Sequence, residues 1–265
     1  MSTQQQQRGL NWFQALAGQA PCIEGLPASL RVADSTLDGQ PVRYLAVVPD
    51  AENPFPRARN GETGLLEGWG LGKAVDQAIE ADASGSQKRA LIAIVDVPSQ
   101  AYGRREEAFG IHQSLAGAVD AYARARQAGH PVIALLVGKA MSGAFLAHGY
   151  QANRMIALRD PAVMVHAMGK ESAARITLRS VEALEELARQ IPPMAYDIDS
   201  YASLGLLWRI LDVRQPGAAD LELVRKTLAQ ALDDIYHHTR DLSSRLNAAN
   251  RASSRLVRER LREQW

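Results

Sequence analysis

The chain has 265 residues, a formal net charge of +1 and a single cysteine, Cys22. A charge near zero gives no field that would recruit nucleic acid or a membrane surface, and one cysteine excludes an intramolecular disulfide and a cysteine-rich metal site. Because no apolar stretch approaches the roughly 20 residues of a membrane-crossing helix, and the polar start lacks a signal-peptide pattern, we expect a soluble protein of the reducing cytoplasm.

The N-terminal part predicts a short helix followed by a hairpin. Residues 1–8 are polar and low in complexity, so we expect them to be disordered. A helix is expected at 10–16. Two strands are expected at 30–33 and 42–48, and Asp38-Gly39 between them is typical of a tight turn.

Residues 50–62 form a long loop that contains proline, asparagine and arginine. The loop is too long for a simple connector, so we expect it to shape a site or an interface. The elements expected next are a helix over 64–83 with Trp69 on its apolar side, a strand over 89–97, a loop over 98–105 and a long helix over 108–128.

The stretch from Val132 to Gly149 is the most informative part of the chain. Its apolar run, Val132–Val137, is typical of a strand buried on both faces. Gly138 is expected to end that strand, and Lys139–Ser142 to form a short turn. The sequence therefore predicts a strand, a tight turn and a helix in succession.

That helix is expected to begin through two small residues, Gly143 and Ala144. The first N–H groups of a helix have no intrahelical partners and lie at the positive end of its dipole. Two such amides can hold an anionic oxygen, such as that of a thioester enolate, without any catalytic side chain. The alternative is that the residues are small only for packing.

The remaining elements complete an alternating order of strands and helices. Strands are expected at 154–158 and 162–166, a helix at 181–190, and a short helix with a strand-like end within 196–212. Such an order favours a mainly parallel sheet with right-handed crossovers in one domain.

The C-terminal part has a different character. From Ala219 the apolar residues step by threes, fours and sevens, which predicts one amphipathic helix, or two joined ones, of roughly 40 residues. Its distal part is rich in arginine, and it either packs back on the body or docks a partner subunit. We thus expect a segment 1–28, a main domain 29–215 and a helical arm 216–265.

Two segments of the main domain resemble the acyl-CoA carboxyltransferase subunits. Val95–Gly103 (VDVPSQAYG) with Arg105–Glu107 resembles their Asp-Thr-Pro-Gly-Ala-Tyr…Glu-Glu-Arg run, and Gly138–Ala144 (GKAMSGA) is similar to their Gly-Glu-Gly-Gly-Ser-Gly-Gly turn. Within that group, three segments resemble the gamma subunit of malonate decarboxylase in particular: 58–62, 165–171 and 191–193. The resemblance spans about residues 44–211.

The resemblance implies an α/β fold of the ClpP/crotonase type, in which ββα units wind into a spiral, here followed by the C-terminal helical arm. It also implies a carboxy-lyase that converts malonyl-S-acyl carrier protein to the acetyl thioester and CO2. The active site would lie between this chain and a beta subunit, with an acyl carrier (delta) subunit and an alpha transferase subunit completing the complex. The substrate would ride on a phosphopantetheine-like prosthetic group, and this chain would bind no cofactor or metal of its own.

The same resemblance assigns site residues. Gly143 and Ala144 would supply the oxyanion-hole amides, and Tyr102, Gly103, Met141 and Ser142 would bind substrate. Met141 stands where the carboxyltransferases have a glycine, so it would narrow the pocket against a biotin ring. His166 is the candidate proton donor in the site, and His148 and Tyr102 are further candidates.

Two other functions compete with this one. The turn also resembles the nucleophile turn of the Clp peptidases, with Ser142 and His166 as a serine–histidine pair. Matching Gly143-Ala144-Phe145 to the peptidase pattern, however, places Met141 at the nucleophile, and methionine cannot attack as an alkoxide does. The second alternative is a non-catalytic scaffold that acts through the loop 50–62 and the C-terminal helix.

Overall fold

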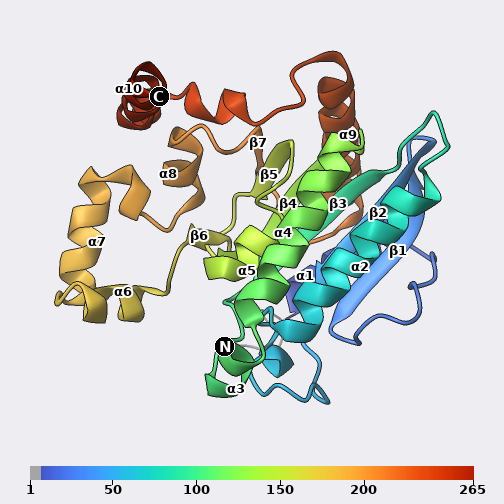
Figure 1. The fold of residues 1–265 in the computed structure, drawn as a ribbon, viewed down its shortest axis with the longest axis horizontal. Helices are drawn as coiled ribbons and strands as arrows, with labels where there is room; N and C mark the ends of the chain where they lie inside the picture. The colour runs from blue at the N-terminus through green and yellow to red at the C-terminus, as the bar shows by residue number, and fades with distance from the viewer. Residues whose placement is uncertain (1–6) are drawn as a thin grey trace.

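The computed structural model describes residues 7–265, and Figure 1 shows their arrangement. The predicted disorder at 1–8 therefore lies mostly outside the described residues. Arg8, however, is ordered: it begins helix α1 (Arg8–Ala17), and its side chain contacts the carbonyl of Val137 at 2.6 Å and Asp160 at 3.3 Å. Buried Trp12, Phe13 and Leu16 then pack α1 on the sheet.

A seven-stranded sheet forms the centre of the molecule. Strands β1 (Leu30–Leu37) and β2 (Gln40–Val47) pair antiparallel through the predicted Asp38-Gly39 turn, where both residues have positive φ. The remaining pairs are parallel, which confirms the expected sheet. The order is β1-β2-β3-β4-β5-β7, with β6 beside β4, and the other strands are β3 (Ala90–Val97), β4 (Val132–Met141), β5 (Arg154–Leu158), β6 (Met164–His166) and β7 (Arg209–Leu211).

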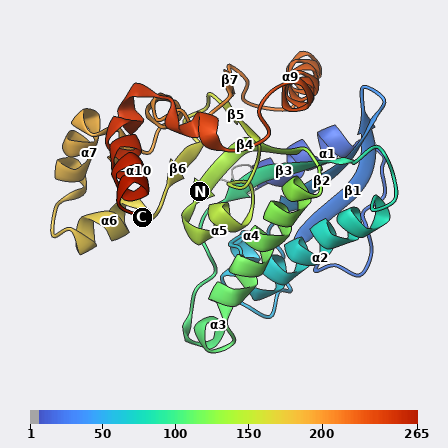
Figure 2. The same cartoon turned by 45° about the horizontal axis from the view of Figure 1, so that its top comes forward.

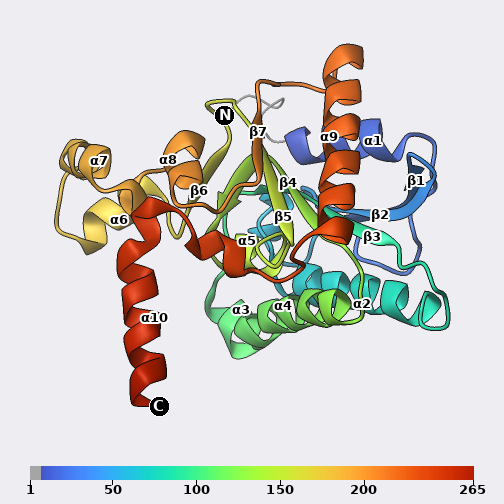
Figure 3. The same ribbon diagram turned by 90° about the horizontal axis from the view of Figure 1, so that it is seen from above.

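Helices cover both faces of this sheet, as Figure 3 shows from above. Helices α2 (Leu65–Ala81) and α4 (Ile111–Gln127) lie together on one face, and α1 and α9 (Ala218–His237) lie on the other. Strand β3 and most of β4 are therefore buried on both sides, as their apolar runs predict.

Two expectations for the helices were wrong. Trp69 is 54% exposed instead of lying on the buried side of α2, which includes Leu71 and Val75; its ring lies over Gly117 of α4. The long helix expected at 108–128 is broken at Gly110, whose φ is +80°, so α3 (Arg104–Ala108) precedes α4 and takes up the end of the predicted loop.

A lateral lobe of three helices projects beside the sheet (Figures 1 and 2). It contains α6 (Lys170–Ile176), which the sequence did not predict, the expected α7 (Val181–Gln190), and α8 (Ile198–Ser203). The lobe begins directly after β6, so it stands next to the end of the sheet where β4 passes into the following helix.

The C-terminal arm is two helices, not one. The buried side of α9, which includes Val224, Leu228 and Leu232, packs on the body. After an irregular stretch with two short 3₁₀ turns, α10 (Ala252–Gln264) extends away from the sheet with no buried residue (Figure 3). The division into 1–28, 29–215 and 216–265 stays a prediction. Among residues 7–265, no helix has the length and apolar character needed to cross a membrane.

Candidate active site

The candidate site is a corner at which β4 turns directly into α5 (Ser142–Ala147). The expected turn at Lys139–Ser142 is wrong, because the strand continues past Gly138 to Met141. It does so because β6 pairs with this extension, with Met141 opposite His166. Ser142 then makes the change of direction with a φ of +57°, a left-handed conformation that is uncommon for serine.

Gly143 and Ala144 occupy the second and third positions of α5, as their proposed role requires. Within residues 7–265, the N–H groups of these two residues donate to no carbonyl or side chain. Gly143 is half-buried, whereas Ala144 is fully buried. Of the two amides, that of Gly143 is therefore the more accessible to a ligand oxygen.

The segment that follows β3 lies alongside this corner. Val97 pairs with Ala140, so three residues further on Gln100 comes beside Gly143. A Cβ on Gly143 would overlap Oε1 of Gln100, and Leu115 of α4 lies 3.5 Å from the same point. Gln100 was missed in the sequence. One feature of the sequence could have indicated it: the segment between Asp96 and Tyr102 is one residue longer than in the Asp-Thr-Pro-Gly-Ala-Tyr run that it resembles.

Tyr102 and Gly103 lie at the outer edge of this segment. Tyr102 is 48% exposed, and the Arg57 guanidinium lies 4.1 Å from the centre of its ring. Glu62 holds Arg57 through two contacts of 2.5 and 2.8 Å, so the long loop 50–62 supports Tyr102, in keeping with its expected role in shaping a site. Gly103 precedes α3, where the Glu106 side chain fills the space of a Cβ.

His166 lies on the opposite side of the corner from Gln100. Its ring stacks on Tyr196 with centroids 3.9 Å apart, and burial lowers the pKa of His166 below its ordinary value. Nδ1 lies 3.0 Å from the Met168 carbonyl, the shortest polar contact of the ring. The Met168 N–H also lies 3.3 Å from Nδ1 and can donate to it, and in either tautomer Nε2 has no partner among residues 7–265.

The prediction of His148 as a proton donor is wrong. The residue is fully buried, with Nδ1 3.1 Å from the Tyr122 hydroxyl and Nε2 3.0 Å from the Ile94 carbonyl. Desolvation lowers the pKa of His148 to about 4. Both nitrogens are therefore engaged in the core, and His148 serves packing.

The geometry does not support the serine hydrolase alternative. Across the described residues, the Ser142 hydroxyl forms no hydrogen bond to His166, and Nδ1 of His166 faces a backbone carbonyl where a catalytic triad has a carboxylate. In the part of the chain that the structure describes, no three His, Cys, Asp or Glu side chains gather in a way that could hold a metal ion.

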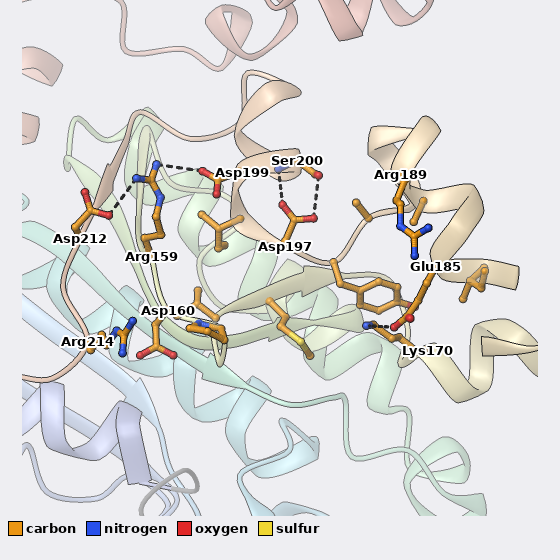
Figure 4. Close-up of a pocket in the computed structure, with 18 of the residues that line it drawn as sticks. Arg159, Asp160, Lys170, Glu185, Arg189, Asp197, Asp199, Ser200, Asp212 and Arg214 are labelled. Carbon is orange, nitrogen blue, oxygen red and sulfur yellow. Dashed lines mark hydrogen bonds and ion pairs between the residues drawn. The ribbon is translucent and has the colours of Figure 1, made fainter. Parts of the chain in front are cut away.

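A separate cavity of about 1220 Å³ lies between the lateral lobe and the body (Figure 4). Half of its charged side chains pair with one another: Arg159 contacts Asp199 and Asp212 at 3.1 Å each, and Lys170 contacts Glu185 at 2.6 Å. Tyr196, which stacks on His166, and Met164 of the same strand line the cavity, whereas no residue of the strand–helix corner does.

The family model for the malonate decarboxylase gamma subunit matches residues 58–265. A curated relative from Malonomonas rubra, the malonyl-S-ACP:biotin-protein carboxyltransferase MADD, is 42% identical over 154 residues. That match takes in 57% of this chain and 53% of the relative, so the chain spans about half the length of the curated relative it matches.

Two solved structures are similar over nearly the whole chain. A chain of a Pseudomonas malonate decarboxylase hetero-tetramer in complex with coenzyme A is 74% identical, with a TM-score of 0.93, and the match covers 97% of this chain and 99% of that one. A chain of the Pseudomonas malonate decarboxylase MdcD-MdcE hetero-dimer is 70% identical, with a TM-score of 0.90 and the same coverage.

A more distant likeness bears on the fold alone. A chain of transcarboxylase 12S has a TM-score of 0.66 at 22% identity, over 88% of this chain and 43% of that one. Together with the Pseudomonas structures, this likeness confirms the expected fold class, an α/β carboxyltransferase-like fold of the crotonase type.

Proposed function

Since the chain belongs to the malonate decarboxylase gamma-subunit family, we propose that it forms half of the site at which malonyl-S-acyl carrier protein loses CO2. The other half comes from a beta subunit. The chain is thus a subunit of a decarboxylase with a carboxyltransferase-like fold. Its malonyl thioester is carried on the phosphopantetheine-like group of the acyl carrier (delta) subunit, and an alpha transferase subunit loads that carrier.

The chemistry requires a place for negative charge. The bond between the malonyl carboxylate and the α-carbon breaks, CO2 leaves, and the electron pair is delocalised onto the thioester oxygen as an enolate. Donors preorganised for that oxygen lower the barrier, because their hydrogen bonds strengthen as its charge develops. A proton added to the α-carbon then gives the acetyl thioester.

The observation that carries the proposal is the strand–helix corner at Gly143. Its amide, which donates to no group among residues 7–265, lies at the N-terminus of α5, and Gly143 has no side chain of its own, although Oε1 of Gln100 occupies the place that a Cβ would take. The amide of Ala144 is the second proposed donor. Tyr102, Gly103, Met141 and Ser142 surround this corner and are proposed to contact the substrate.

His166 is the proposed proton donor for the α-carbon. It lies one strand from the corner, opposite Met141, with one nitrogen free. Burial lowers the pKa of His166, which makes the protonated ring a stronger acid toward the carbanion; the ring gives its proton to the α-carbon and is reprotonated from solvent.

A shared site is supported by the assemblies of the relatives. The 70% identical Pseudomonas chain is part of an MdcD-MdcE hetero-dimer, and the 74% identical one is part of a hetero-tetramer in complex with coenzyme A. Met141 is buried and Ser142 half-buried within this chain, and we propose that a beta subunit supplies the rest of the pocket wall.

Replacing Gly143 by valine tests the amide. In the assembled complex, we expect Gly143→Val to lower kcat for malonyl thioester by on the order of 100-fold or more, because the side chain displaces the oxygen from the amides. Gly217→Val is the matched control, since Gly217 has open space around it at the start of α9. Turnover and assembly by gel filtration are measured for both.

Wild-type turnover of an assembled Gly143→Val complex would exclude the corner from the reaction. If that complex turns over normally while the beta subunit without this chain is inactive, the scaffold function is the correct one.

A further inference from the structure

Outside the corner's own residues, the Gln100 side chain is the nearest group to a Cβ built on Gly143. Its backbone is fixed by neighbours on both sides: the Thr63 N–H donates to the Ser99 carbonyl at 3.0 Å, and the Ala101 N–H donates to the Thr63 carbonyl at 2.8 Å. The side chain extends from this anchored segment to Gly143. Gln100 is therefore presented at the corner by a rigid edge.

The carboxamide of Gln100 has no hydrogen-bond partner among residues 7–265, although the residue is half-buried. Asn53, a buried amide of the loop 50–62, is by contrast fully engaged, donating to Glu67 at 2.8 Å and accepting from the Phe55 N–H at 3.0 Å. With Oε1 of Gln100 against the glycine, its Nε2–H donors are the part left for a ligand.

The groups around Gln100 suit a carboxylate that leaves as CO2. The guanidinium of Arg57, at the outer edge, is already paired with Glu62. A lysine or arginine at position 100 would stabilise the malonyl carboxylate in the ground state, and that charge leaves the carboxylate as CO2 forms. A neutral amide can orient the carboxylate with less of this penalty.

We propose that Nε2 of Gln100 donates a hydrogen bond to the malonyl carboxylate and holds it for cleavage while the thioester oxygen sits on the Gly143 amide. This inference rests on the proposed function. It makes Gln100 a substrate-binding residue that selects a thioester bearing a free carboxylate, and it places the departing CO2 on the β3 side of the corner, away from His166.

The test uses the assembled complex with three variants: Gln100→Met, which keeps the volume and loses the donors; Gln100→Glu, which adds a charge; and Gln127→Glu, an exposed control on α4. We expect Gln100→Met to lower kcat/KM for malonyl thioester at least tenfold. Gln100→Glu should lower kcat/KM further at pH 7.5, and its kcat/KM should rise as the pH falls, because a protonated glutamate can again donate a hydrogen bond.

Binding of the acetyl thioester gives a second readout. Its dissociation constant should be unchanged by either substitution at Gln100, because the product has no carboxylate, and this binding also reports a folded site. The proposal is overturned if Gln100→Glu and Gln100→Met have the same pH profile, or if both variants weaken acetyl thioester binding as much as they lower kcat/KM. If both Gln100 variants have wild-type kinetics and the Gly143→Val complex is inactive, the inference about Gln100 is refuted and the proposed function is not. Wild-type kinetics at both positions would refute the proposed function as well.

Discussion

His148 and His166 were both candidate proton donors in the sequence, but the fold places them in opposite environments. Both ring nitrogens of His148 are bonded in the core, whereas His166 lies at the edge of the corner and its Nε2 has no partner among residues 7–265. The imidazole chemistry is the same in each case. Burial and hydrogen bonding decide which residue can exchange a proton with a substrate.

The buried state of His148 makes stability depend on pH. Its pKa is about 4 in the folded chain against about 6.5 when unfolded. Below pH 6.5 the His148 side chain is protonated in the unfolded chain but stays neutral in the folded chain. The free energy of unfolding is therefore highest above pH 6.5 and decreases as the pH falls toward 4. This linkage amounts to about 2 kcal/mol between pH 7.5 and pH 5.

We therefore expect His148→Asn to lower the free energy of unfolding by about 2 kcal/mol at pH 7.5 and by much less at pH 5. At pH 5 the wild-type protein has already lost the stability that the neutral, buried His148 side chain contributes. Urea unfolding at both pH values measures the two differences. His112→Asn, on the exposed side of α4, is the control. An equal loss at both pH values for His148→Asn would contradict the assignment.

At the scale of elements, the contact between α2 and α4 explains why a glycine-rich helix is stable. Glycine disfavours a helix by about 1 kcal/mol relative to alanine. Gly68, however, allows the Ser114 backbone to approach, and the Ser114 hydroxyl reaches the Leu65 carbonyl at 2.8 Å. The close packing brings α4 down on the sheet, and α4 in turn supports the candidate site through Leu115.

The two glycines of this contact should respond differently to alanine. Gly68→Ala should destabilise the protein by about 1–3 kcal/mol, because its Cβ would overlap Ser114. Gly72→Ala should be neutral or stabilise by up to about 1 kcal/mol, since the nearest atom would be 3.7 Å away. Thermal unfolding of the two variants side by side checks the sign of each change.

At the scale of the whole molecule, the two halves of the C-terminal arm differ in what they contribute. Helix α9 closes one face of the sheet with Val224, Leu228 and Leu232. Helix α10 leaves Leu256 and Leu261 about half exposed and is tied back by Arg255, which reaches the carbonyls of Leu246 and Ala248. The fold therefore depends on α9 and little on α10.

Deleting residues 252–265 should accordingly change the free energy of unfolding by no more than about 1 kcal/mol, because no side chain of α10 is buried. Leu228→Ala should cost about 2–5 kcal/mol, since it leaves a cavity under α9. Chemical denaturation of both variants checks the contrast. A large loss on deletion would show that α10 holds the body together.

The sequence by itself determined the alternation of strands and helices, the Asp38-Gly39 hairpin and the mainly parallel sheet. Apolar runs such as Val132–Val137 are long and periodic, so burial on both faces could be read from local pattern alone. The place of the corner was also predicted from Gly143 and Ala144, because small residues after a buried strand are a local feature.

Only the tertiary structure decided what surrounds that corner. Strand β4 extends to Met141 because β6, more than 20 residues further along the chain, returns to pair with it. Gln100 comes beside Gly143 because β3 and β4 run parallel in register. His148 and His166 are separated into core and edge by the same sheet. These arrangements depend on pairing between segments that are distant in the sequence, and the local pattern of apolar residues does not determine which strands become neighbours.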